Sequence, residues 1–156
     1  MRWLVFVAAL LPAPAALAGP LPEGREGWEI READRPSKDL AAALDAAIEA
    51  GPLGKVNEAS ATVGAGRIGK SIPGNKVVGV FAPRYAVRML DASVAAGIEA
   101  PLRFYIVERD ANAAALAWER PSVTFAPYDD GGRTLDDLAS ELDGVMADIA
   151  DRAAAP

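Results

Sequence analysis

Residues 72–83 read IPGNKVVGVFAP and carry a strong strand signal. The apolar run at 76–81 is typical of a strand that is central in a sheet. A turn precedes the run, because Pro73 disfavours a helical residue before it and the following Gly-Asn pair favours a turn. Pro83 suits the first turn of a helix, which we expect to run to Gly97. This stretch therefore predicts a turn, a strand and a helix in succession.

The segments around this stretch also alternate between strands and helices. Apolar and charged residues alternate over 27–32, the pattern of a half-buried strand, and 53–58 is expected to be a second strand. Between them, apolar residues recur at helical spacing after Ser37, which we expect to be the N-cap. Residues 102–107 and 115–119 flank a short run of turn-forming residues, so they are expected to form a hairpin.

The C-terminal segment has the clearest helical pattern. Thr134 is the expected N-cap, and the two acids soon after it favour the positive end of the helix dipole. Apolar residues then repeat at spacings of three and four, at Leu135, Leu138, Leu142, Val145 and Ile149. We expect one amphipathic helix that packs on a sheet. The sequence shows no internal repeat and no domain boundary, so 27–153 is expected to be a single domain.

The N-terminus has the three parts of a secretory signal. A positive charge at Arg2 precedes an apolar core at 4–11, and small residues flank the expected cleavage site after Ala18. The apolar core is too short to span a membrane, which needs about 20 residues. We therefore expect a signal peptide at 1–18, a flexible leader at 19–26, and a soluble mature chain that is periplasmic or secreted, with no membrane span.

The composition limits the chemistry of the chain. It has 16 basic and 22 acidic residues, a formal net charge of −6, which argues against a nucleic-acid partner. It has neither cysteine nor histidine, so thiolate and imidazole chemistry is closed to it. We expect no cofactor and no metal site. Chemistry based on carboxylate, Lys, Tyr, Ser or Arg groups stays open, as does binding alone.

Residues 64–71 read GAGRIGKS, a complete match to the phosphate-binding pattern G-x-x-x-x-G-K-[ST]. A P-loop needs a buried strand before it and a helix directly after it, so that backbone N–H groups and the helix dipole hold the phosphates. Here the turn at Pro73 follows, and the residues before Gly64 form a poor buried strand. We expect a short helix or a turn, and keep nucleotide binding through Lys70 as a remote alternative.

Residues 56–121 resemble the domain-of-unknown-function family 302. The resemblance rests on the stretch at 72–83, on AGIEAPLR at 96–103, and on WERP at 118–121. It implies a compact α+β domain with helices packed on an antiparallel sheet, often found as a homodimer, and it implies no established activity. In this alignment the segment at 64–71 falls on a short helix and the turn after it.

The chain departs from the family at positions that suggest a site. Many exported members carry an acid-His pair where this chain has Asn57 and Glu58. Glu58 is expected at a strand end, as an acid, a ligand-contacting carboxylate or a ligand of a hard cation. The alternative is a solvated charge. Arg84 and Tyr85 are expected at a helix start, as an anion site or, alternatively, as ordinary surface residues.

The sequence leaves two main functional hypotheses. The first is an exported, non-enzymatic module that binds a small ligand or a protein through the face around Glu58, Phe81, Arg84 and Tyr85, as a homodimer. The second is an enzyme that uses carboxylate and arginine groups on a small substrate. No residue is assigned a catalytic role, because spacing alone brings no pair of carboxylates together.

Overall fold

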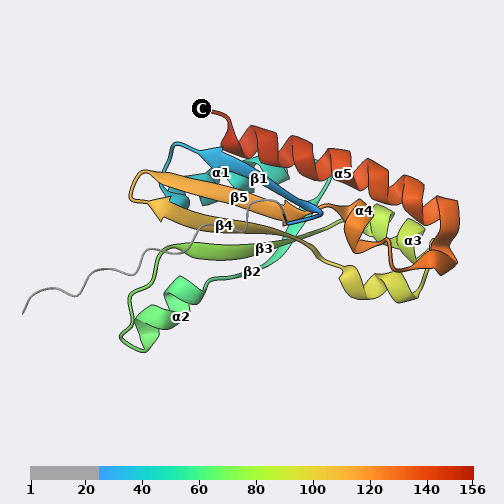
Figure 1. Cartoon of the computed structure of the whole chain (residues 1–156), viewed down its shortest axis with the longest axis horizontal. Helices are drawn as coiled ribbons and strands as arrows, with labels where there is room; N and C mark the ends of the chain where they lie inside the picture. Colours follow the sequence, from blue (N-terminus) through green and yellow to red (C-terminus); the bar gives the residue numbers. More distant parts are fainter. Residues whose placement is uncertain (1–24) are drawn as a thin grey trace, which may run out of the picture.

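The computed structural model describes residues 25–156, so the expected signal peptide and most of the leader lie outside the described residues. Five strands form one sheet in the order β1-β5-β4-β3-β2, and every neighbouring pair is antiparallel (Figure 1). The strands are β1 (Trp28–Ala33), β2 (Gly54–Ala59), β3 (Asn75–Phe81), β4 (Leu102–Asp110) and β5 (Ala113–Glu119). The hairpin predicted for residues 102–107 and 115–119 is confirmed, because β4 and β5 pair and are joined by a tight turn.

Two helices, α1 (Ser37–Glu49) and α5 (Gly132–Ala154), pack on one face of this sheet (Figure 1). Shorter helical segments gather at one end of the sheet: α3 (Pro83–Ala92), η1 (Ala95–Glu99), α4 (Pro121–Thr124) and η2 (Asp129–Gly131). The remaining helix, α2 (Ala61–Arg67), projects beyond the sheet edge next to β2. The prediction of an α+β domain with helices on an antiparallel sheet is confirmed.

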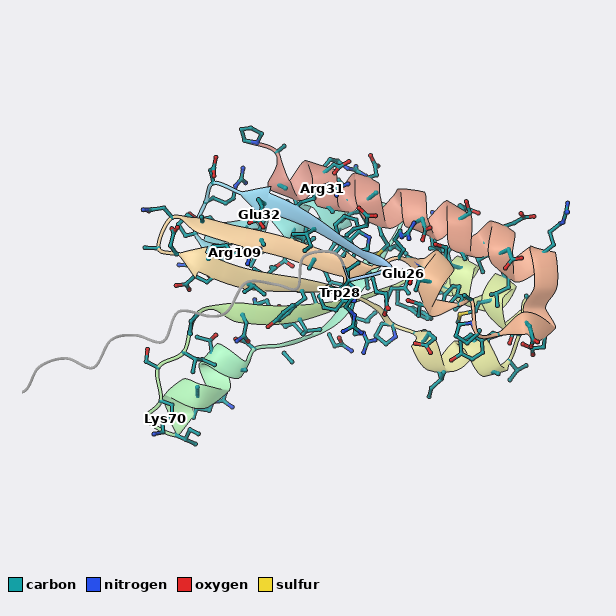
Figure 2. All side chains as sticks on the ribbon, in the orientation of Figure 1. Glu26, Trp28, Arg31, Glu32, Lys70 and Arg109 are labelled. Atoms are coloured by element: carbon teal, nitrogen blue, oxygen red, sulfur yellow. The ribbon has the colours of Figure 1, made fainter. Side chains whose placement is uncertain are left out.

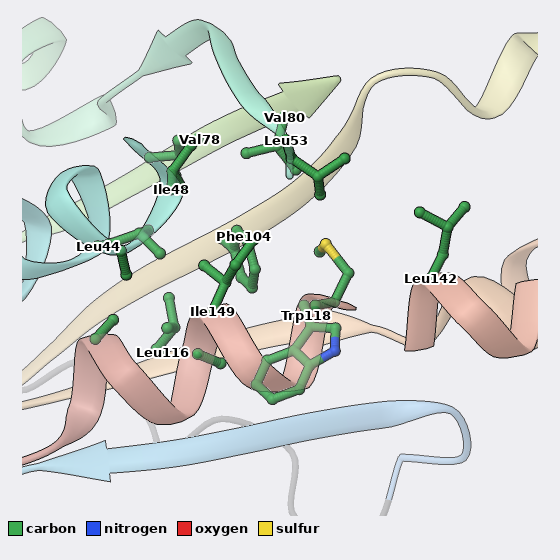
Figure 3. Close-up of a cluster of buried hydrophobic side chains, with 14 of the residues drawn as sticks. Leu44, Ile48, Leu53, Val78, Val80, Phe104, Leu116, Trp118, Leu142 and Ile149 are labelled. Carbon is green, nitrogen blue, oxygen red and sulfur yellow. The ribbon is translucent and has the colours of Figure 1, made fainter. Parts of the chain in front are cut away.

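The core lies between the sheet and the two long helices (Figure 3). Side chains of a strand alternate between the two faces of a sheet, so every second residue of β4 and β5 points to the helices. Phe104 and Trp118 meet there edge to face, with ring centroids 5.9 Å apart. Leu44 of α1 and Ile149 of α5 are fully buried in the same cluster.

The helix predicted from Pro83 to Gly97 ends earlier, at Ala92. Ser93 is extended, with φ −147° and ψ 114°, and its buried hydroxyl donates a 2.7 Å hydrogen bond to Asp130. The same hydroxyl accepts a 3.2 Å bond from the Ala96 N–H, a local side-chain bond of the kind that competes with a continuing helix. Gly97 lies in the separate segment η1.

Two predicted helix starts were also wrong. Pro36 is the N-cap of α1, and Ser37 is its first helical residue without a capping bond from its side chain. The last helix begins at Gly132, before the expected cap Thr134, because η2 leads directly into it. Within that helix Met146 is fully buried, whereas Val145 is only half-buried.

The second face of the sheet has its own small apolar cluster. Val107, Ala115 and Ala117 are buried, and half-buried side chains of Trp28, Ile30 and Tyr105 pack around them. All these residues come from strands, so no helix residue takes part in this cluster. Among residues 25–156, no helix is long and apolar enough to cross a membrane.

Candidate functional site

Glu58 lies on the edge strand β2 between two lysines. Its carboxylate is 3.2 Å from the Lys55 ammonium and 3.3 Å from that of Lys76. Hydrogen bonds from Lys55 and then Lys76, reinforced by their charges, lower the pKa of Glu58 below its ordinary value. Glu58 therefore stays a carboxylate at neutral pH, which suits it to hold a cation in place.

The same cluster continues to α1. Lys55 also donates a 2.9 Å bond to Asp45, and this bond, followed by the one to Glu58, raises the pKa of Lys55. Asp45, Lys55, Glu58 and Lys76 thus form a chain of alternating charges, which we call the edge cluster. It links α1 to the edge strand β2 and to its neighbour β3.

A cleft of about 390 Å³ opens beside the edge cluster, between α1, α2 and β3. Ile106 of the core lies at its base, and Asp45 and Lys76 belong to both the cleft and the edge cluster. Lys38 adds an exposed ammonium group at the start of α1 and forms no ion pair with any residue of 25–156. This volume is within the range of about 300–1,000 Å³ that is typical of small-molecule sites.

Hydrogen bonds fix the wall of the cleft that α2 provides. Ser60 donates to the carbonyl of Asn75 at 2.7 Å, and Thr62 donates to the carbonyl of Pro73 at 3.0 Å. The Asn75 side chain in turn accepts from the Ala61 N–H at 3.0 Å. These bonds tie α2 to the start of β3 and pair the polar groups of this wall with one another. The ammonium groups of Lys38 and Lys76 take no part in them.

Phe81, Arg84 and Tyr85 lie together at the opposite end of β3. Phe81 and Tyr85 line an apolar cavity of about 30 Å³, room for little more than a water molecule. The Arg84 guanidinium stacks 4.7 Å above the Tyr85 ring and donates a 3.1 Å bond to its hydroxyl. This end is a packed corner of the domain.

The structure therefore divides the four residues predicted as a site into two groups. Glu58 pairs with Val78 of β3, whereas Phe81 pairs with Gly54, three positions further along the strand. Three strand residues span roughly 10 Å. Sequence reasoning missed Lys38, Asp45, Lys55 and Lys76, since only the strand register and the α1 contact bring them near Glu58.

The segment 64–71 does not have the arrangement of a P-loop. Its first four residues belong to α2, where the Gly64 N–H already donates to Ser60, and the Lys70 N–H donates to Ala65. The helix precedes Lys70, and a strand follows it, the reverse of the order that phosphate binding needs. Helix α2 and the turn after it (residues 61–71) project from the sheet, and we call them the α2 arm. Lys70 lies at its tip (Figure 2). The expected short helix and turn are confirmed.

The fold and the site together define a small α+β domain, and residues 25–156 contain no cluster of three or more acidic side chains that could hold a metal ion. The sequence profile of the family described as "Domain of unknown function DUF302" matches residues 31–152, and the chain belongs to this family. This confirms the resemblance seen in the sequence.

One solved structure supports the fold. The crystal structure of an uncharacterized conserved protein DUF302 from Bacillus stearothermophilus has a TM-score of 0.73 to this chain, at 14% identity. The match covers 83% of this chain and 99% of that chain, and at this identity it shows the fold alone. No curated protein matches the chain.

Proposed function

We propose that this chain is an exported, non-enzymatic binding module that holds a small anionic ligand in the cleft between α1, α2 and β3. The observation that carries the proposal is the Lys38 ammonium, which forms no ion pair with any described residue and shares a cleft of about 390 Å³ with Lys76. A cation without a counter-ion at a concave site attracts an anion. Export rests on the signal-like pattern of residues 1–18.

The edge cluster explains how such a ligand would be recognised. Glu58 holds the Lys76 ammonium at the cleft rim through a 3.3 Å contact, so this donor is positioned before a ligand arrives. Because its pKa is lowered, Glu58 orients a donor rather than transferring protons. The carboxylate–arginine alternative has less support, since Glu58 contacts lysines and Arg84 stacks on Tyr85.

Calorimetric titration with succinate, acetate and inorganic phosphate tests the proposal. We expect at least one anion to bind, and Lys38→Ala to weaken its binding tenfold or more, since loss of a charged contact costs at least about 1.4 kcal/mol. Lys70→Ala removes the same charge outside the cleft and serves as the control. Equal losses in the two variants, or no binding by any of the three anions, would overturn the proposal.

A second feature favours a homodimer. Ile68 and Val63 on the α2 arm are 76% and 59% exposed, and Val56 on the edge strand is 53% exposed. Such apolar groups on a projecting arm are a feature of association surfaces. We therefore propose that two copies pair through the α2 arm and β2, and that Ile68→Ser shifts the pair toward monomer in sedimentation experiments. A wild-type chain that stays monomeric at high micromolar concentration would contradict this.

A further inference from the structure

We propose a second ligand site on the face of the sheet opposite α1 and α5, with the chemistry to bind a small aromatic zwitterion such as an aromatic α-amino acid. The site is a groove of about 260 Å³ that crosses β1, β5 and β4. It shares no lining residue with the cleft at α2, so this proposal is independent of the function proposed above.

The groove exists because a small residue lies between larger ones. In the strand register, Ala117 of β5 lies between Ile30 of β1 and Tyr105 of β4. The Ala117 side chain ends at Cβ and is fully buried, so it forms a low floor. Trp28 and Tyr105 rise on either side as half-buried aromatic walls (Trp28 is marked in Figure 2). Two aromatic walls over an apolar floor suit a planar ring.

Opposite charges lie at one end of the same groove. Glu119 pairs with Trp28 across β1 and β5, and Arg103 lies on the neighbouring strand β4. Neither side chain forms an ion pair or hydrogen bond with any residue of 25–156. The other nearby acid, Glu99, already accepts a 2.5 Å bond from Tyr128. The anion Glu119 and the cation Arg103 are therefore available beside the aromatic walls, and a second cation, Arg25, stacks on one face of Trp28 with its guanidinium 4.9 Å from the ring centroid.

These groups match a single ligand class. A carboxylate would pair with the planar guanidinium of Arg103, and an ammonium group would pair with Glu119, while the ring lies between Trp28 and Tyr105. The volume of about 260 Å³ is slightly below the usual range for drug-sized ligands, which limits the ligand to about one amino acid. The indole Nε1 of Trp28 is buried without a hydrogen-bond partner among the described residues, an unsatisfied donor in the same wall.

The test is an NMR titration of the full chain that follows the assigned indole N–H signal of Trp28. L-Phenylalanine is compared with 3-phenylpropanoate, which lacks the amine, with phenethylamine, which lacks the carboxylate, and with glycine, which lacks the ring. We expect phenylalanine to shift the Trp28 signal and to bind at least tenfold more tightly than each of the other three. Arg103→Gln and Glu119→Gln should each weaken phenylalanine binding, whereas Arg133→Gln, an exposed arginine on α5, should not.

Several results would overturn the proposal. One is an unchanged Trp28 signal at millimolar phenylalanine. Another is equal binding of phenylalanine and 3-phenylpropanoate, which would show that Glu119 takes no part. A third is an equal effect of Arg103→Gln and Arg133→Gln, which would show that net charge alone matters. Loss of anion binding at the α2 cleft leaves all these outcomes unaffected.

Discussion

Lys55 and Glu58 form a 3.2 Å ion pair on the same side of β2, although residues three apart in a regular strand point to opposite faces. A bulge explains the relationship, since the pairing of β2 with β3 shifts between Lys55 and Asn57. Because the bulge adds one residue to β2, the side chain of Glu58 points to the same face of the sheet as those of Lys55 and Lys76. The edge cluster thus depends on one irregularity in the outermost strand.

Glu58→Gln is expected to lower stability at neutral pH by at most about 1 kcal/mol, because the pair is exposed and screened by water. The folded-state pKa of Glu58 lies below its ordinary value. Its contribution is therefore fully present above the ordinary pKa and is lost as the pH falls through the lower, folded-state pKa. Urea unfolding of both proteins should show a small difference at pH 7 that closes in acid; a difference that widens in acid would contradict the assignment.

Leu44→Ala is expected to cost about 2–5 kcal/mol, because it leaves a cavity in the core between α1, the sheet and α5. Ile98→Ala is the matched control, since Ile98 in η1 is 79% exposed and its truncation should change stability by less than about 0.5 kcal/mol. Urea unfolding of the two variants checks the difference. Equal losses would mean that Ile98 is packed more tightly than the structure shows.

Within the segment from Arg31 to Arg152, trypsin is expected to cut first after Arg67 or after Lys70. The α2 helix has seven residues, none of them buried, so it can open locally while the sheet stays folded. Mass spectrometry of the early fragments identifies the bond. A first cut at Arg133, within the long helix α5, would contradict the expectation, because buried residues hold that helix on the sheet.

The sequence predicts most of the fold because burial follows local periodicity. The alternation over 27–32 and the helical spacing of leucines after Thr134 identify β1 and α5, since each pattern gives one apolar side. The end of α3 was missed for the opposite reason. The extended residue at its end, Ser93, is held by a bond to Asp130, a residue 37 positions away, and no local pattern reveals such a partner.

The candidate site was predictable only in part. Glu58 was expected at a strand end, and the structure places it there, next to the last residue of β2. Its lysine partners depend on the bulge in β2 and on the register with β3, which spacing alone does not give. Phe81 and Tyr85 were expected on the same face as Glu58, but strand length separates them from it.

ATP with Mg²⁺ is expected to leave the melting temperature of the chain unchanged. The segment that matches the P-loop pattern has its helix before Lys70 instead of after it, and the Gly64 and Lys70 N–H groups already donate to backbone carbonyls. No helix start therefore faces Lys70 to hold a phosphate. Thermal-shift measurements on the wild type and Lys70→Ala check this. A stabilisation by ATP that disappears in Lys70→Ala would show that the segment binds nucleotide after rearranging.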